Sequence, residues 1–323
     1  MKVAHSITNV DQLKILADSR RLNILRHLMA TPATLTQLAA AVNHSPAWVK
    51  HHIFQLEAGG LVELAEIRTT GMVTEKYYRA KAGAWLLHQV VLPLGSKPVI
   101  LLSGSHDLAL ELLAEKLSPH TDLIIQPVGS LDGLANLRLG LCQLSGTHLQ
   151  DASGEYNVPF IRQMFPDQDI SLITLAHREQ GLLVAPGNPK HIHTLHDLTR
   201  KNVLFVFRNR GSGTRLWLDK ALHQTGIPSE KVRAHPAAVT THSEAAELIQ
   251  RGEADATLAL HAAADQHGLD FIPLYHERYD LAFPAQHRQQ LAPILDYILR
   301  ADYHREVESM PGYDCRHTGE QVL

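Results

Sequence analysis

The apolar residues of this 323-residue chain change their spacing near residue 97, and this change predicts two differently built parts. Up to residue 92 they recur at intervals of three and four, the spacing of one face of a helix. Beyond residue 97, short and wholly apolar runs alternate with helical stretches. Continuous apolar strands are buried on both faces, so this second pattern predicts a mostly parallel α/β sheet. The length also suits about two domains.

Charge and cysteine content narrow the functional classes. The net charge is −3, and 45% of the residues are hydrophobic, as in globular proteins. Basic residues outnumber acidic ones over residues 1–92 and are outnumbered in the remainder, so the N-terminal part is the one expected to meet a polyanion. The two cysteines, Cys142 and Cys315, are too few for a disulfide framework or a four-thiolate zinc site. With no export signal and no membrane-spanning run, we expect a cytoplasmic protein without a membrane partner.

Residues 1–92 are expected to form short helices followed by a β-hairpin. Ser45 and Pro46 are typical of a helix start, and the glycines at 59 and 60 are typical of its end. Two strands are expected at Leu61–Ile67 and Val73–Tyr78, joined by a loop from Arg68 to Gly71. This order of elements is that of a winged helix-turn-helix domain.

Three segments in this part, Leu16 to Leu25, Leu35 to Ala39 and Ser45 to Ile53, resemble the ArsR-type repressors in sequence and in order. The resemblance implies a domain that binds double-stranded DNA, with one helix in the major groove. The residues expected to contact DNA are Ser45, Ala47, Trp48, Lys50 and His51 on that helix and Arg68 at the wing tip. Trp48 is an unusual base reader, and the alternative is that it packs at the helix edge. A protein-docking module with merely solvated charges is the alternative for the whole domain.

Many ArsR-type repressors sense metals through cysteines on the helix that corresponds to Leu35–Val42. That segment contains no Cys, His, Asp or Glu, so any sensing is expected elsewhere in the chain. The resemblance also implies that residues 82–92 form a dimerisation helix of a homodimer, which fits the reading of two half-sites. Residues 93–97 are expected to be a linker, which places the DNA-binding domain at residues 1–92.

Five turns that are rich in small hydroxyl residues and glycines lie at the ends of expected strands or just before an expected helix. Backbone N–H groups and hydroxyls in such turns, aided by helix dipoles, are suited to binding an anion. None of these turns is a Walker A loop or a dinucleotide-binding glycine motif, so ATP and NAD are disfavoured. The turns lie at residues 103–107, 129–134, 145–148, 208–215 and 240–242.

Residues 98–318 resemble the periplasmic-binding-protein-like domains found in molybdopterin-biosynthesis proteins and behind helix-turn-helix regulators. The resemblance implies a two-lobed domain of type II, with the chain crossing between lobes near residues 178–187 and 279–284. It suggests molybdate, tungstate or a molybdenum-linked ligand. The segments that carry it are Gly104 to Leu113, Ser153 to Phe160, Arg178 to Leu182, Ala185 to Pro189, Arg210 to Arg215 and Glu277 to Leu281.

A cleft of hydroxyls and N–H groups suits fully ionised dianions, which need only hydrogen-bond donors. Phosphate carries a proton and needs an acceptor, which Asp107 or Asp132 would supply unless they cap helices. Several arginines would instead suit an organic acid or a phosphorylated pterin. The expected ligand-binding residues are Ser103, Ser105, His106, Ser130, Thr147, Asn157, Arg178, Arg210, Ser212, Gly213, Thr214 and Arg215.

The sequence therefore predicts an α/β protein with a winged-helix N-terminal module: a cytoplasmic, ligand-responsive transcriptional regulator. It is expected to be no enzyme and to need no cofactor or metal, because no nucleophile–base pair stands out. One alternative is a molybdenum-cofactor biosynthesis protein, and another is a sensor of an organic acid. A third is a metal sensor using His191, His193 and His196, which we expect to be a solvated surface run instead. Cys142, in an apolar run, is expected to pack in the core.

Overall fold

The computed structural model describes all residues except 1–3, 8–9, 72, 88–89, 94 and 238. The chain divides into two compact units, Met1–Val91 and Leu92–Leu323, which we describe separately. Among the described residues, no helix is long and apolar enough to cross a membrane.

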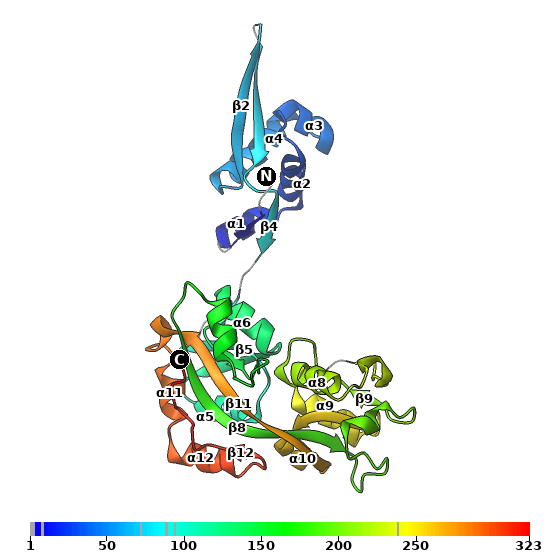
Figure 1. Ribbon diagram of the computed structural model, residues 1–323. Helices are drawn as coiled ribbons and strands as arrows, with labels where there is room; N and C mark the ends of the chain where they lie inside the picture. The colour runs from blue at the N-terminus through cyan, green and yellow to red at the C-terminus, as the bar shows by residue number, and fades with distance from the viewer. Residues whose placement is uncertain (1–3, 8–9, 72, 88–89, 94, 238) are drawn as a thin grey trace. The chain divides into compact units, whose positions relative to one another are not determined.

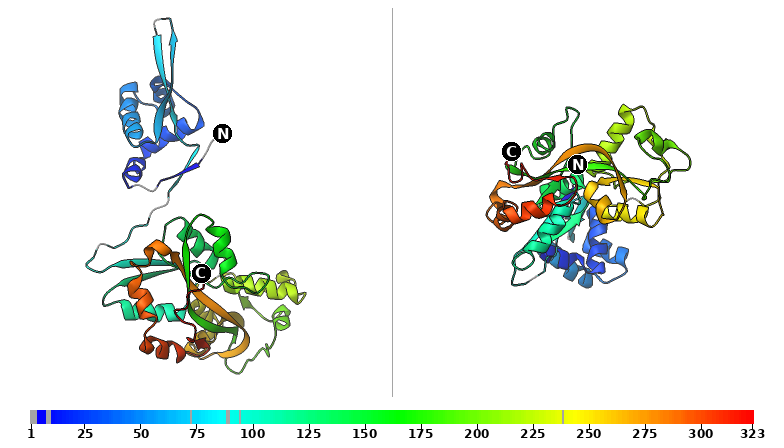
Figure 2. Two further views of the ribbon diagram at one scale, coloured as in Figure 1. Left: turned by 60° about the vertical axis from the view of Figure 1, so that its left-hand side comes forward. Right: turned by 90° about the horizontal axis from the view of Figure 1, so that it is seen from below.

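The N-terminal unit packs four helices beside a long antiparallel hairpin, β2–β3, which projects from them (Figures 1 and 2). A second, parallel pair joins β1 to β4. The elements are β1 (Ala4–Ile7), α1 (Val10–Leu16), α2 (Ser19–Ala30), α3 (Leu35–Val42), α4 (Pro46–Ala58), β2 (Val62–Thr70), β3 (Val73–Ala80) and β4 (Ala84–Leu87).

Local sequence explains where the helices of this unit begin and end. The Ser45 hydroxyl caps α4, Pro46 occupies its first turn, and Gly59 ends it, all as predicted. Thr34 and Gln37 form a capping box at α3. The helices bury one apolar face each in a shared core that contains Ile24, Leu25, Leu28, Leu38, Val49, Ile53 and Leu56.

Two predictions for this unit are wrong. The expected dimerisation helix at residues 82–92 contains instead the strand β4, whose residues pair with β1. A short apolar run does not distinguish helix from strand by its spacing, and the N-terminal partner strand decides here. The expected loop from Arg68 to Gly71 is shorter, because β2 continues to Thr70. Arg68 therefore lies within a strand and not at the wing tip.

The C-terminal unit has two lobes joined by the long strands β8 (Ile170–Val184) and β11 (Asp270–Pro284) (Figures 1 and 2). The first lobe consists of residues 92–169 and 285–323. Its elements are β5 (Val99–Gly104), α5 (Leu108–Leu117), β6 (Asp122–Pro127), α6 (Ser130–Arg138), β7 (Ser145–Thr147), α7 (Val158–Met164), η3 (Ala285–His287), α11 (Ala292–Tyr297), α12 (Ala301–Glu308) and β12 (Tyr313–Asp314).

The second lobe consists of residues 185–269. Its elements are η1 (Leu195–Thr199), β9 (Phe205–Val206), α8 (Gly213–Gln224), η2 (Ser229–Lys231), α9 (His242–Gln250), β10 (Ala256–Leu260) and α10 (His261–Gln266). Leu172 of β8 packs in a cluster of first-lobe residues and Leu182 in one of second-lobe residues, while a further core cluster contains residues of both lobes. The strand therefore passes from one lobe to the other between these two residues.

The main sheet is mixed, which corrects the prediction of a mostly parallel one. Its strand order is β7-β11-β8-β10-β9, with β12 also paired to β8. Within this sheet, β10 and β9 are parallel, whereas β8 is antiparallel to both β10 and β11. The reason is that both lobe-to-lobe connections are themselves strands, and they run side by side in opposite directions. The strands β5 and β6 form a separate parallel pair.

Candidate functional site

A buried ion-pair group lies where β8 and β11 run between the lobes. The side chain of Arg178 is fully buried, and its Nε donates to Glu277 Oε1 at 2.6 Å. Its Nη1 donates to Asp107, and the guanidinium lies 4.3 Å from the centre of the Tyr279 ring. Burial opposes the charge on Arg178, but the carboxylates of Glu277 and Asp107 outweigh it and raise its pKa. One guanidinium thus neutralises two buried carboxylates in part and leaves this group net negative.

His148 joins the same group from the first lobe. Its Nδ1 lies 2.7 Å from Glu277 Oε2, and its Nε2 lies 2.7 Å from the Ser105 hydroxyl. Burial lowers the pKa of His148, so the neutral ring is favoured. The neighbours then assign the tautomer: Nδ1–H donates to Glu277, and Nε2 accepts from Ser105.

The second lobe contributes a second buried arginine, Arg208. Its Nη1 donates to His242 Nδ1 at 2.8 Å, and its Nη2 donates to the Thr240 carbonyl at 2.6 Å. In the described part of the chain, no carboxylate lies within ion-pair distance of Arg208. Burial, and after it the charge of Arg178, lowers the pKa of Arg208 to about 9. Arg208 is thus a buried cation that lacks a bonded counter-charge.

The contact with Arg208 also fixes the protonation of His242. A guanidinium only donates, so His242 Nδ1 accepts and its proton is on Nε2. The backbone N–H of His242 donates to His106 Nδ1 at 3.2 Å, which links the two lobes. His106 Nε2 then donates to Glu111 Oε1 at 2.7 Å.

Several buried polar atoms in this region have no hydrogen-bond partner. Five of these atoms are donors that lack an acceptor: Arg178 Nη2, Arg208 Nε, His242 Nε2 and the hydroxyls of Thr214 and Tyr275. Gln180 Oε1 is an acceptor without a donor. We call His148, Arg178, Gln180, Arg208, Thr214, His242, Tyr275 and Glu277 the interlobe cluster.

The titratable members of this cluster lie close enough to shift one another's pKa values. Burial lowers the pKa of His242 well below its usual value, and the charges of Arg208 and Arg178 add to the effect. Burial and the charge of Glu277 raise the pKa of Tyr275. Since unsatisfied buried donors are costly and rare in proteins, these five, one of them on Arg208 itself, mark a candidate anion site. The charges of Glu244 and Glu277 oppose the lowering of the Arg208 pKa, but neither carboxylate bonds to Arg208.

The two lobes are in direct contact around the interlobe cluster. Lys220 Nζ donates to the Asp151 carbonyl at 2.9 Å, and Asn209 Nδ2 donates to the Val128 carbonyl at 2.7 Å. The lobes are therefore closed at these contacts. A cavity beside them, lined by residues that include His148, Tyr156 and Trp217, is about 20 Å³ and has room for about one water molecule.

Glycine at position 213 is required for this closure. A Cβ atom built there would lie 2.6 Å from the His148 ring and 2.7 Å from its carbonyl oxygen, closer than atoms approach. We expect Gly213→Ala to hold the lobes apart and to weaken ligand binding about 5- to 150-fold, the effect of 1–3 kcal/mol of overpacking in the closed form. Titration calorimetry measures this, with Gly95→Ala as the control because a Cβ there meets no atom within 4 Å. Unchanged affinity in Gly213→Ala would show that binding needs no closure.

The structure brings only part of the predicted ligand-binding set to the interlobe cluster. Arg178 and Thr214 belong to the cluster, and Ser105, His106, Ser212 and Gly213 adjoin it. The Ser130 hydroxyl accepts from the His148 backbone N–H at 3.2 Å. Ser103 lies inside the first lobe, where its hydroxyl donates to Gln126 and accepts from Asn136.

Thr147 and Asn157 form a separate buried network. The Thr147 hydroxyl donates to Asn157 Oδ1 at 3.1 Å, and Asn157 Nδ2 donates to Asp280 Oδ2 at 2.8 Å. Burial raises the pKa of Asp280. Asn157 has a left-handed φ of 60° at the start of α7, so this network holds a strained turn rather than facing the cleft.

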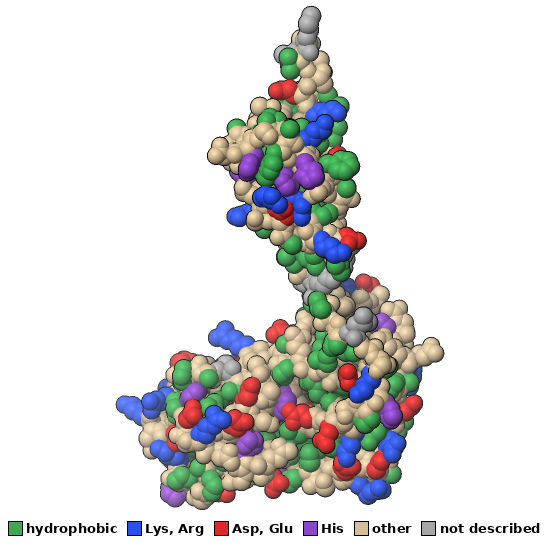
Figure 3. Space-filling model, turned by 180° about the vertical axis from the view of Figure 1, so that it is seen from behind, with side chains coloured by type: hydrophobic (Ala, Val, Ile, Leu, Met, Phe, Trp, Pro, Cys, Tyr) green, Lys and Arg blue, Asp and Glu red, His purple; other side chains and the backbone are tan. Residues whose placement is uncertain are grey.

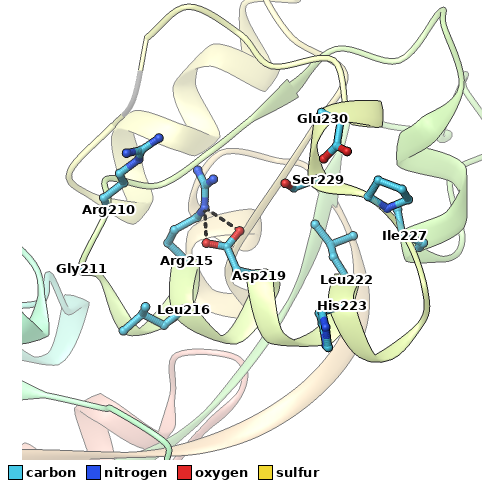
Figure 4. A pocket seen from close by; sticks show the side chains of 11 residues that line it. Arg210, Gly211, Arg215, Leu216, Asp219, Leu222, His223, Ile227, Ser229 and Glu230 are labelled. Carbon is cyan, nitrogen blue, oxygen red and sulfur yellow. Dashed lines mark hydrogen bonds and ion pairs between the residues drawn. The ribbon is translucent and has the colours of Figure 1, made fainter.

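Arg210 and Arg215, which the sequence predicts to bind ligand, lie outside the interlobe cluster. Both line an outer pocket of about 580 Å³ on the second lobe (Figure 4). Arg215 Nε donates to both carboxylate oxygens of Asp219 at 2.9 Å, and Arg210 is exposed. The reason is helical geometry, because Arg215 follows the inward-facing Thr214 by one position, about 100° around α8.

Other expectations can be compared with the structure directly. Asp107 caps α5 as expected, whereas α6 has no side-chain cap and Asp132 only occupies its first turn. Cys142 is buried in a core cluster, as predicted. The three histidines at 191, 193 and 196 are exposed, and no group of metal-ligating side chains occurs among the residues that the structure describes.

The predicted DNA-contacting helix, α4, presents a polar face to solvent. Ala47, Lys50 and His51 are exposed, and the Ser45 hydroxyl accepts from the Trp48 N–H at 3.3 Å. Trp48 is half-buried and stacks on the His44 ring at 3.8 Å, so it packs at the helix edge. Figure 3 shows histidine and basic side chains close together on one face of this unit. Arg68 is paired with Glu66 and lies over the Tyr77 ring, and part of its charge is therefore already compensated.

Lys50 is the exposed α4 cation for which the clearest effect is expected. We expect Lys50→Ala to weaken DNA binding uniformly across sequences and to reduce the salt slope of the affinity by about 0.9, the loss of one phosphate contact. Fluorescence anisotropy at several salt concentrations measures this. Lys201→Ala, an exposed lysine on the second lobe, is the control and should leave the slope unchanged. An unchanged slope in Lys50→Ala would exclude Lys50 from the DNA-binding face.

Sequence reasoning missed six members of the interlobe cluster as ligand-binding residues. Arg208 and His242 lie in two of the turns that the sequence predicts to bind an anion, but the prediction did not select these two side chains. Gln180 carries a usable signal, because it lies two positions after Arg178 and hence on the same face of a strand. Nothing in one sequence shows that His148, Tyr275 and Glu277 pack against these residues.

Comparisons with known proteins agree with this architecture. The model of the PBP superfamily domain matches residues 110–298, and that of the bacterial regulatory protein, arsR family, matches residues 18–63. The uncharacterized protein YvgK of Bacillus subtilis (strain 168) is 32% identical over 234 residues, covering 70% of this chain and 74% of YvgK. An uncharacterized Clostridium pasteurianum protein, encoded 5′ to a 2Fe-2S ferredoxin gene, is 28% identical over 108 residues, covering 32% of this chain and 96% of that protein.

A solved structure has the same fold at low identity. It is a phosphate ABC transporter substrate-binding protein with bound phosphate from Clostridium perfringens, with a TM-score of 0.50 and 16% identity, covering 66% of this chain and 97% of that one. The chain therefore belongs to the PBP superfamily domain family, with an ArsR-family helix-turn-helix domain at its N-terminus.

Proposed function

We propose that this protein is a ligand-responsive transcriptional regulator whose ligand, a small oxyanion, binds in the interlobe cluster. The observation that carries this proposal is Arg208, a buried cation with a free Nε and no bonded carboxylate, beside four further buried donors that lack acceptors. An oxyanion supplies both the missing charge and the missing acceptors. The N-terminal ArsR-family domain supplies the DNA-binding function.

Molybdate and tungstate are the first ligands to test, because the sequence resemblance favours them. The donor set by itself suits any small oxyanion, and the similar fold from Clostridium perfringens holds phosphate. A pterin or another organic acid stays the alternative ligand.

Control of DNA binding requires that cleft closure alters the DNA-binding units. We propose a cytoplasmic homodimer in which two copies of α4 contact successive half-sites of the DNA. Closure of the cleft between the lobes then changes how well both copies bind their half-sites at the same time. A coupling free energy of about 1–3 kcal/mol is enough to change DNA affinity 5- to 150-fold.

The test is a gel-shift titration of the full chain. Preferred DNA is first selected from a random pool, and its affinity is then measured with molybdate, tungstate, phosphate and sulfate. We expect sequence-selective binding that one of these anions changes at least fivefold in the wild type but not in Gly213→Ala. Absence of selective DNA binding under every condition would contradict the regulator, and selective binding that no anion changes would contradict the proposed sensor.

A further inference from the structure

Among the free atoms of the interlobe cluster, one can only accept a hydrogen bond, whereas the others are N–H donors or hydroxyls that can donate. This acceptor bears on which oxyanion fits. Gln180 is fully buried, and its Oε1 has no hydrogen-bond partner. Its Nε2 donates to Glu277 Oε1. A carboxylate accepts only from a donor, so this contact fixes which end of the amide faces Glu277 and leaves the oxygen free.

The position of Gln180 places its side chain on the same sheet face as two of the free donors. Arg178 pairs across the sheet with Glu277, and Gln180 pairs with Tyr275, so all four side chains lie on one face of β8 and β11. Arg178 Nε and Gln180 Nε2 both donate to the same atom, Glu277 Oε1. The side chain of Gln180, with its free Oε1, is therefore on the same sheet face as Arg178, whose Nη2 is free, and Tyr275, whose hydroxyl is free.

The nearby carboxylates differ from Gln180, because each of their oxygens already accepts at least one hydrogen bond. Both oxygens of Glu277 accept from Arg178, Gln180 or His148. Outside the cluster, Asp107 Oδ1 accepts from the Leu110 N–H, and its Oδ2 accepts from Arg178 and Tyr313. Within the described residues of the cluster, the unpartnered side-chain atom that can only accept is thus the amide oxygen of Gln180.

We propose that Gln180 is a specificity-determining residue that selects oxyanions carrying one hydroxyl, such as hydrogen phosphate or hydrogen arsenate. This inference rests on the proposed function. A fully ionised anion, such as sulfate, molybdate or tungstate, satisfies the donors but leaves the Gln180 oxygen buried without a partner. Hydrogen phosphate satisfies the donors with its oxygens and donates its single proton to Gln180.

The test compares phosphate with sulfate, which has nearly the same size and no proton to donate. Titration calorimetry of the full chain at mildly alkaline pH should show tighter binding of phosphate by about 5- to 150-fold, the effect of one satisfied buried group. In Gln180→Met the ratio should fall to about 1, through the loss of phosphate affinity. Tyr275→Phe, which removes a free donor and keeps the stack on Trp217, should weaken both anions and keep the ratio.

The outcomes separate this inference from the proposed function. Tighter binding of sulfate or molybdate than of phosphate by the wild type would overturn the role of Gln180 and leave an oxyanion sensor in place. An unchanged ratio in Gln180→Met would also overturn it. If Gln180→Met does not fold, the wild-type ratio of arsenate to sulfate decides in the same way. Absence of binding by all these anions would overturn the proposed function, and this inference with it.

Discussion

Arg208→Met should abolish the anion response and leave the ligand-free protein about as stable as the wild type. Arg208 is buried without a bonded carboxylate, and its pKa is lowered to about 9. Removing it takes away the cost of a buried charge, which offsets the lost hydrogen bonds to His242 and Thr240, so stability should change by about 1 kcal/mol or less. Anion affinity should fall at least about 30-fold, because a fully desolvated charge contact is lost.

Thermal unfolding with and without anion measures both effects. An anion at 100 times its Kd stabilises the wild type by about 2.7 kcal/mol. In Arg208→Met this increment should fall to about 0.9 kcal/mol for a 30-fold loss of affinity, and towards zero for a larger loss. Arg210→Met is the matched control, because Arg210 is exposed and lines the outer pocket (Figure 4). A full anion response in Arg208→Met, or its loss in Arg210→Met, would contradict the assignment of the site to the interlobe cluster.

Arg178→Met should have the opposite signature and destabilise the C-terminal unit by about 3–5 kcal/mol. The difference from Arg208 follows from the partners: Arg178 faces two buried carboxylates, Glu277 and Asp107. Without the guanidinium, these two groups are left as uncompensated buried charges. Denaturant unfolding followed by circular dichroism measures the loss.

A double variant separates charge from packing in this prediction. Adding Glu277→Gln to Arg178→Met removes one of the two uncompensated carboxylates and should restore part of the lost stability. If Arg178→Met unfolds at the same denaturant concentration as the wild type, the buried ion pairs do not stabilise the connecting strands β8 and β11.

The architecture of both units follows from local patterns in the sequence. Ser45 and Pro46 define the start of α4, and the apolar runs at Val99–Leu102 and Ala256–Leu260 locate buried strands. The errors arise where pairing across the chain decides. Residues 84–87 become a strand because β1 pairs with them, and β8 and β11 are antiparallel because both connect the lobes.

The candidate site was predictable only in part for a related physical reason. Arg178 and Thr214 could be selected because they lie in recognisable segments. Glu277 lies 99 residues from Arg178 in sequence, and the pairing of β8 with β11 brings the two together. Arg215 lies outside the cluster, and residue type and segment do not tell which side of α8 faces the cleft. The charge balance around Arg208, which carries the proposal, appears only in three dimensions.

The most direct test of the account is to locate a heavy oxyanion in crystals of the full chain by anomalous scattering. Crystals grown with arsenate, and in parallel with tungstate, make the anion visible without assumptions about its site. The account predicts a peak within hydrogen-bond distance of Arg208, His242 and Thr214, between closed lobes. A peak in the outer pocket beside Arg210 and Arg215, with none in the interlobe cluster, would contradict it.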